Sequence, residues 1–156
     1  MTPTSLVLDL VERVWNGGDL AALPDYFADP YEHDDGTGTV EQLLAWHRDD
    51  AETWAGTTYA VLDCVAHDDA VALRWRASST HVGQWGAVPS TGRRVEWVGA
   101  HFFRVEGGRI VAMHALADRF GKAMQLGVSI APPETTPETT PETTPEKPGD
   151  DEGAGR

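Results

Sequence analysis

The chain has 156 residues, which suits one domain and is too short for two of ordinary size. Its formal net charge is −13 at pH 7, and no basic stripe occurs in it. This excludes a nucleic-acid-binding surface and disfavours an anionic membrane, because both partners are bound through clustered Lys and Arg. Cys64 is the only cysteine, so an intrachain disulfide and a thiolate metal site are also excluded.

The N-terminal segment MTPTSLVLDLVERV carries Asp9 and Glu12 within its apolar stretch and has no basic residues ahead of it. We therefore expect neither a signal peptide nor a membrane span, which needs ~20 apolar residues. The expected location is the cytoplasm.

The last part of the chain differs sharply in composition. From Pro132 it reads PPETTPETTPETTPEKPGDDEGAGR, with no aliphatic or aromatic residue larger than alanine. Such a segment cannot offset its own ordering entropy by burying apolar surface. The sequence predicts a folded domain over residues 1–130 and a disordered acidic tail over 131–156, with a docking segment as the alternative reading of the tail.

Apolar residues recur at helical spacing in three places in the first third of the chain. Each predicted helix follows a residue that can cap it: Thr4 or Ser5, then Asp19, then Thr39. The helices are expected over residues 6–15, 20–27 and 40–54, with a short extended piece, Tyr31–Asp34, before the third.

The rest of the domain alternates in polarity like β-structure. Four strands are predicted, at Thr58–His67, Ala70–His81, Arg93–Glu106 and Arg109–Ala117, and Asp118–Gly127 has helical character. Helices followed by a long meander predict an α+β fold, with a curved antiparallel sheet whose concave face is packed by the N-terminal helices. A sheet closed in this way at one end leaves a deep apolar pocket.

A series of short motifs occurs in order over about residues 6–128. They are VWNGGDL (14–20), YEHD (31–34), RW (74–75), THVG (80–83), PSTGR (89–93), FRVEGGRIV (103–111), Asp118 and QLG (125–127). In this order they resemble the SnoaL-like polyketide (ester) cyclases, a family with the cone fold of nuclear transport factor two.

The resemblance implies an enzyme of secondary metabolism that needs no metal or organic cofactor. It also implies a homodimer formed through the exposed sheet face. Arg74, Arg76, Arg104 and Glu106 could mark that face, the alternative being that a polar face of this kind is simply solvated. Known family members close a ring by intramolecular aldol condensation, with an aspartate matching Asp118 as the acid–base residue. Many members have His-Trp where this chain has Met113-His114, and a one-residue shift along a strand moves a side chain to the opposite face.

Three residues are the candidates for catalysis. Asp118 follows apolar residues, and desolvation raises the pKa of a carboxyl toward the range useful for proton transfer; the alternative is that it caps the helix after it. His33 could donate to a substrate carbonyl, or hydrogen-bond to Asp34 or Asp35 in a loop. His101 is in phase with Trp97 and Phe103, a stripe that could face the pocket.

The predicted substrate is small, apolar and polyketide-like. Aromatic residues of a cone build both its core and its pocket, so some must face the ligand. The residues expected to contact substrate are Trp15, Phe27, Tyr31, Trp75, Trp97, Phe103 and His114.

Of the remaining histidines, His67 and His81 are expected to be solvated near strand ends, and His47 to lie on a helix flank. None of the six histidines has the spacing of a zinc site, so no metal is predicted.

Two other functions fit the same fold. An epoxide hydrolase of the limonene type would pair aspartates around an arginine, and Asp63 and Arg74 are conceivable partners for Asp118. A non-catalytic small-molecule carrier would bind a ligand in the pocket without converting it.

Overall fold

The structure is a computed structural model that describes residues 1–130; the predicted disordered tail lies outside the described residues. The chain begins with helix α1 (Pro3–Asp9), which continues into one π-helical segment, η1 (Leu10–Asn16). The predicted first helix is therefore confirmed. Its cap is Thr2, whose hydroxyl accepts from the backbone N–H of Ser5, and not Thr4 or Ser5 as expected.

The second predicted helix is short and irregular. It consists of a 3₁₀ turn, η2 (Leu20–Ala22), and one α-helical turn, α2 (Leu23–Tyr26). The side chain of Asp19 makes no capping hydrogen bond and instead pairs with Arg13 at 2.9 Å. Strand β1 (Phe27–His33) begins directly afterwards, and a turn joins it to the short strand β2 (Gly36–Gly38).

Helix α3 (Val40–Thr53) begins as predicted, with a capping box between Thr39 and Gln42. Strand β3 (Trp54–His67) follows it without a loop. The predicted boundaries of β4 (Ala70–His81) and β6 (Arg109–Ala117) are confirmed, and β5 (Arg94–Glu106) begins one residue later than expected. The last element is helix α4 (Arg119–Gln125).

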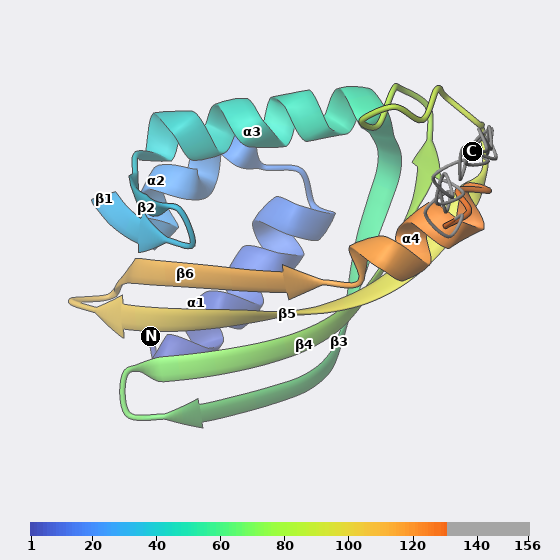
Figure 1. Cartoon of the computed structure of the whole chain (residues 1–156). Coiled ribbons are helices and arrows are strands. Elements are labelled where there is room, and N and C mark those ends of the chain that lie inside the picture. The colour runs from blue at the N-terminus through green and yellow to red at the C-terminus, as the bar shows by residue number, and fades with distance from the viewer. Residues whose placement is uncertain (131–156) are drawn as a thin grey trace, which may run out of the picture.

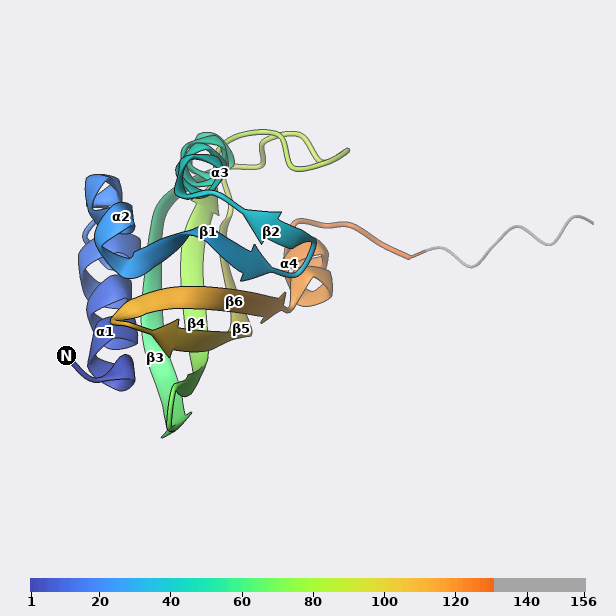
Figure 2. The same cartoon turned by 90° about the vertical axis from the view of Figure 1, so that its left-hand side faces the viewer.

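The six strands form one curved sheet in the order β2-β1-β6-β5-β4-β3. The α+β fold with helices against a curved sheet is confirmed, with one difference in strand direction. Strand β1 pairs in parallel with β6, whereas all other pairs are antiparallel. Figure 1 shows the long strands bending around α1, and Figure 2 shows α3 crossing the open side of the sheet above β1 and β2.

The core lies between the N-terminal helix and the concave face of the sheet. Val7, Leu10, Val11 and Val14 on the helix are fully buried, as are their sheet partners such as Leu73. Each such aliphatic side chain contributes about 1.5–3 kcal/mol by leaving water. Because the sheet curves away from this core, space remains under α3. Within residues 1–130 no helix is both long and apolar enough to cross a membrane.

Candidate active site

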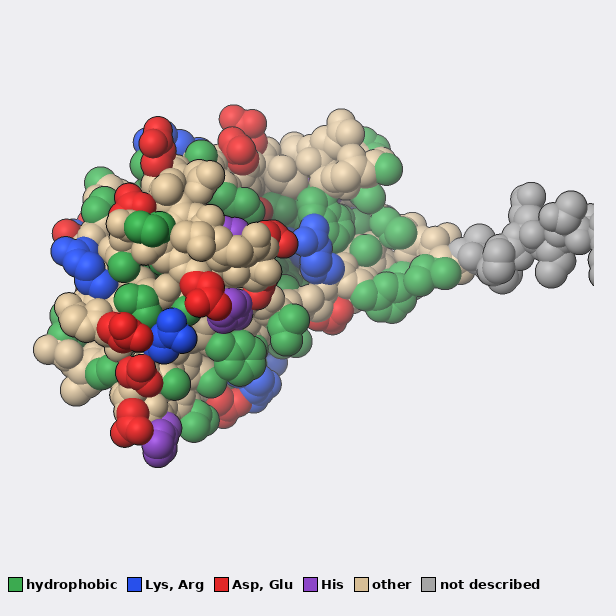
Figure 3. Space-filling model, turned by 60° about the vertical axis from the view of Figure 1, so that its left-hand side comes forward, with side chains coloured by type: hydrophobic (Ala, Val, Ile, Leu, Met, Phe, Trp, Pro, Cys, Tyr) green, Lys and Arg blue, Asp and Glu red, His purple; other side chains and the backbone are tan. Residues whose placement is uncertain are grey.

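A cavity of about 590 Å³ lies between α3, the β1–β2 hairpin and the inner face of β5 and β6. Figure 3 shows the molecule hollowed on this side, with a histidine inside and acidic side chains near the rim. Most of the wall is apolar or aromatic: Trp15, Phe27, Tyr31, Leu43, Trp46, Tyr59 and Met113. The polar part of the wall consists of His33, Asp34, Asp35, Thr37, Gln42, His47 and His101, and no Lys or Arg of the described chain lines it.

His101 is the most completely defined polar group of this wall. The indole Nε1–H of Trp75 donates to its Nδ1 at 2.8 Å. Because an indole can only donate, Nδ1 carries no proton, and the neutral ring must be protonated at Nε2. Burial lowers the pKa of His101 to about 4, although the Asp34 carboxylate acts in the opposite direction. At neutral pH His101 is therefore a neutral side chain with one N–H available for donation.

The tautomer of His101 depends on Gly99, which lies in the same strand, β5. Gly99 pairs with Trp75 across β5 and β4, and a Cβ at Gly99 would collide with the indole ring. The absent side chain allows the indole to lie flat over the strand and reach His101. Trp15 and Phe103 pack against the imidazole at ring-centroid distances of 4.8 and 5.7 Å.

His33 is held in a similar way at the other side of the cavity. The backbone N–H of Asp35 donates to its Nδ1 at 3.2 Å, so the neutral ring again carries its proton on Nε2. The ring lies against Gly38 of β2, where a Cβ would come within 2.7 Å of the imidazole Cδ2. A larger residue at position 38 would displace the ring.

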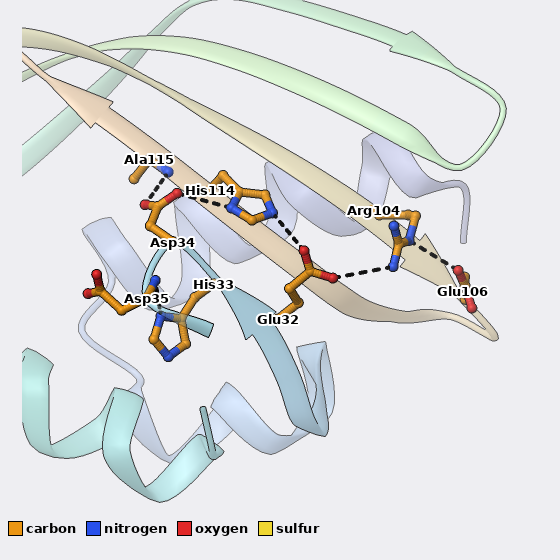
Figure 4. Close-up of polar contacts among 8 residues, drawn as sticks. All are labelled: Glu32, His33, Asp34, Asp35, Arg104, Glu106, His114 and Ala115. Carbon is orange, nitrogen blue, oxygen red and sulfur yellow. Dashed lines mark hydrogen bonds and ion pairs between the residues drawn. The ribbon is translucent and has the colours of Figure 1, made fainter. Parts of the chain in front are cut away.

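Asp34 fixes the hairpin that carries His33 to the edge of β6 (Figure 4). Its carboxylate accepts from the backbone N–H of Ala115 and from Nδ1 of His114, both at 3.0 Å. The hydrogen bond from Ala115, followed by that from His114, lowers the pKa of Asp34. The cavity wall thus includes one ionised carboxylate that already accepts two hydrogen bonds and retains free lone pairs.

Helix α3 and strand β3 supply two further polar groups, His47 and Tyr59. Burial lowers the pKa of His47 to about 4 and raises that of Tyr59 to about 12, the latter with help from the Asp50 carboxylate. Both are therefore neutral, and the phenol keeps its proton. Asn16 holds the backbone of Tyr59 through two hydrogen bonds, of 2.7 and 3.0 Å.

Comparison with known proteins identifies the family. The family model described as SnoaL-like polyketide cyclase matches residues 5–126. The chain belongs to the SnoaL-like polyketide cyclase family. No curated protein matches significantly.

Three solved structures from Streptomyces species have a similar fold. IdmH from Streptomyces antibioticus, a candidate polyketide cyclase, is 28% identical over 82% of this chain and 100% of its own, with a TM-score of 0.72. TsrD from Streptomyces laurentii is 26% identical over 79% and 96% of the two chains, with a TM-score of 0.71. AclR from Streptomyces galilaeus, a candidate hydroxylase, is 22% identical over 84% and 85%, also with a TM-score of 0.71, which shows the fold alone.

The structure places five of the predicted SnoaL-like site residues on the cavity wall and five elsewhere. Trp15, Phe27, Tyr31, His33 and His101 line the cavity. Trp75, Trp97 and Phe103 are buried and do not line this cavity. Trp75 instead supports His101. Trp97 and Trp54 enclose the ammonium of Lys122, whose Nζ lies 3.7 and 3.5 Å from their ring centroids.

The predicted orientation of Asp118 is also wrong. Its side chain is exposed and accepts from the backbone N–H of Gly121 at 2.7 Å, which confirms the alternative that it caps α4. It borders a shallow groove on the outer face of the sheet together with Arg74 and Leu116. The carboxylate is therefore separated from the cavity by the sheet.

A β-bulge in β6 explains why His114 and Asp118 point outward. Val105 pairs with Ile110, but Arg104 pairs with Ala112, so Val111 is an extra residue in β6. The extra residue reverses the facing of the rest of the strand: Met113 and Ala115 line the cavity, and His114 lies on the outer side between Asp34 and Glu32 (Figure 4). In a regular strand, His114 would share the inward face of Ile110.

Two further histidines lie elsewhere than expected, and the structure also shows where Asp63 and Arg74 lie. His47 lines the cavity instead of lying on a helix flank, and His81 is fully buried against Trp54 instead of being solvated. Arg74 pairs with Asp63 at 2.5 Å, but both side chains are more than half exposed on the outer face. Within residues 1–130 no group of three His, Cys, Asp or Glu is arranged to hold a metal ion.

Sequence reasoning missed Asp34, His47 and Tyr59 as cavity residues. The i, i+4 relation between Leu43 and His47, which puts both on one face of α3, was the available signal for His47. No sequence signal indicated that the Asp34 carboxylate would reach the edge of β6.

Proposed function

We propose that this SnoaL-like protein is a cofactor-independent acid–base enzyme that closes a ring in a neutral, apolar, polyketide-like molecule. The cavity supports a neutral substrate, because its described wall carries carboxylates and neutral histidines and no cation to bind an acid or a phosphate. The aromatic wall suits a flat ring system.

The single observation that carries the proposal is the hydrogen bond from Trp75 to His101. It presents a neutral imidazole N–H to a largely apolar cavity. Such a donor stabilises the charge that develops on a carbonyl oxygen as an enolate forms, and it does so more strongly than in water. Because the ring stays neutral near pH 7 and its Nδ1 already accepts from Trp75, its Nε2 carries the proton and can only donate.

The carboxylate of Asp34 is our candidate for the base, acting as an ionised group at the cavity rim, where its side chain is 55% exposed and its hydrogen bonds lower its pKa. It lines the same cavity and is close enough to His101 to raise the pKa of that residue. In an aldol closure it would take the proton from the carbon between two carbonyls. The carbanion then adds to a second carbonyl of the same molecule, and the new alkoxide takes back the proton held by the Asp34 carboxyl, directly or relayed through the Tyr59 phenol, while His101 donates a hydrogen bond without giving up its proton.

The test is proton exchange on a simple ketone, since the natural substrate is not needed for enolisation. Exchange of the α-protons of 1-tetralone in D₂O, followed by NMR, should be accelerated by the protein. His101→Phe keeps an aromatic ring and removes the donor, and it should reduce the exchange rate by about 100-fold. A rate unchanged in His101→Phe would contradict the proposal. Binding of 1-tetralone without any accelerated exchange would instead favour a carrier.

We also propose that two copies pair through the outer face of the sheet. This face carries exposed apolar side chains, with Leu116 70% and Phe102 48% exposed on adjacent strands. The charged residues predicted to mark the face, including Arg74, Arg76 and Arg104, are exposed beside them. Contiguous apolar surface of this kind is typical of an interface between subunits.

A further inference from the structure

A second cavity, of about 500 Å³, lies beside the first one. It is bounded by α2 and the start of β1 on one side and by the first turns of α3 on the other. Its wall is mainly apolar, with Leu20, Leu23, Pro24, Val40 and Leu44. Three charged residues at its boundary, Asp29, Glu41 and Arg109, contribute the polar part. The space therefore suits an uncharged hydrocarbon group better than a charged one.

Phe27 is the one residue that lines both cavities. It is the first residue of β1, its side chain is only 3% exposed, and its ring meets the edge of Tyr31 at a centroid distance of 5.0 Å. The benzyl group thus forms the partition between the two spaces.

The backbone of Phe27 is held on both sides, so its side chain is the part of the partition that can change. Phe27 pairs with Ile110 of β6, and the guanidinium of Arg109 donates to the carbonyl oxygens of Phe27 and Pro24. Rotation or shortening of the side chain would join the cavities without moving the strand. No helix or hairpin has to move for this.

We infer that Phe27 sets the depth of the substrate cavity, and that the second cavity receives an apolar chain attached to the ring system bound in the first. The inference rests on the proposed function, because it takes the first cavity as the substrate site. It assigns the substrate class more narrowly: a neutral aromatic ketone whose alkyl or aryl substituent points toward α2. Each methylene that enters the second cavity should improve binding by about fourfold.

The test uses two probes, 2-acetylnaphthalene and 2-hexanoylnaphthalene, with affinities measured by isothermal titration calorimetry. Phe27→Leu opens the partition and keeps an apolar side chain. It should raise the affinity for the hexanoyl probe relative to that for the acetyl probe by at least about tenfold compared with the same ratio in wild type. An equal change for both probes would overturn the inference.

Leu44→Trp provides the matched control, because residue 44 lines only the second cavity and is partly exposed on α3. Added to Phe27→Leu, it should remove the gain for the hexanoyl probe and leave the acetyl probe unchanged. Alone, it should weaken only the hexanoyl probe, which keeps the test valid if the Phe27 variant folds poorly. If the double variant Phe27→Leu/Leu44→Trp, in which the indole fills the space, still gains affinity for the hexanoyl probe, the inference would also be overturned.

The outcomes separate this inference from the proposed function. A chain-length effect at Phe27 together with no exchange of 1-tetralone by wild type would support the two-part cavity and contradict the enzyme. Accelerated exchange with no chain-length effect would support the enzyme and contradict the role of Phe27. Failure of wild type to bind the acetyl probe would contradict both.

Discussion

The carboxylate of Asp34 accepts a hydrogen bond from the backbone N–H of Ala115 at 3.0 Å, across 81 positions of sequence. The bond satisfies an amide of β6 beyond the last residue that pairs with β1, Ala112. It also fixes the end of β1 and the turn that follows it, where His33 and Asp35 lie in the cavity wall. One side chain thus joins the edge of the sheet to the substrate site.

Replacing Asp34 by Asn should therefore reduce both stability and activity. Loss of the charge-assisted hydrogen bonds should cost about 1–2 kcal/mol in free energy of unfolding, and loss of the proposed base should lower 1-tetralone exchange by more than about 100-fold. Urea denaturation and NMR exchange measure the two effects. Asp35→Asn is the matched control, since Asp35 lines the same cavity without contacting Ala115. Equal effects of the two variants would contradict the assignment to Asp34.

The hydrogen bond of Asp34 also makes stability depend on acid pH. The folded-state pKa of Asp34 is lowered, so its contribution is fully present above the ordinary aspartate pKa and is lost as pH falls through the folded value. The stability difference between wild type and Asp34→Asn should therefore narrow below about pH 4. A difference that stays constant from pH 7 to pH 2.5 would contradict this account.

Trp75→Phe should free the tautomer of His101 without removing its ring. The wild-type imidazole should show a protonated Nε2 and an unprotonated Nδ1 in ¹⁵N NMR, because Nδ1 accepts from the indole. In the variant both tautomers become accessible, and exchange of 1-tetralone should fall by about tenfold, with little change in its affinity. Trp97→Phe is the control, since Trp97 lies on the same strand as His101 and donates no hydrogen bond to it. Wild-type protein with Nδ1 protonated would contradict the mechanism.

Two partly buried histidines of the cavity wall should make the protein sensitive to mild acid. The folded-state pKa values of His101 and His47 are both lowered to about 4 by burial, below the ordinary histidine value. The unfolded chain therefore takes up protons first as pH falls from about 6.5 toward 4, and stability decreases over that window by up to about 1.4 kcal/mol per pH unit for each histidine. His47→Gln should roughly halve the slope in urea denaturation, whereas replacement of the exposed His67 should leave it unchanged. An identical slope in His47→Gln would exclude this origin.

The fold was largely predictable because its signals are local. The Thr39–Gln42 capping box marks the start of α3, and polarity alternation gives β4 and β6 with their observed boundaries. The facing of β5 was also predictable, since Trp97, His101 and Phe103 share one side of a regular strand. The parallel pairing of β1 with β6 was not, because it depends on tertiary packing of a short strand.

The site was only partly predictable, because it depends on two features without a local signal. One is the extra residue Val111, which reverses the facing of β6 and turns His114 and Asp118 outward. The other is the position of α3 over the sheet, which brings His47 to the same cavity as His101. Composition identified the aromatic residues, but only the structure separates those on the wall, such as Trp15, from those behind it, such as Trp75.

The proposed homodimer is tested on the outer face of the sheet. Leu116 is among the most exposed large apolar side chains of the described chain, and it lies opposite Ala100 beside Phe102. An arginine at position 116 would place an unpaired charge within the interface, so Leu116→Arg should convert dimers to monomers in sedimentation velocity. Met124→Arg is the control, because Met124 is also exposed but lies on α4 and not on the sheet. If Leu116→Arg stays dimeric, or wild type is monomeric at high micromolar concentration, the two copies do not pair through this face. Because Leu116 and the cavity are on opposite sides of the sheet, the monomer should keep its affinity for 2-acetylnaphthalene, which separates assembly from substrate binding.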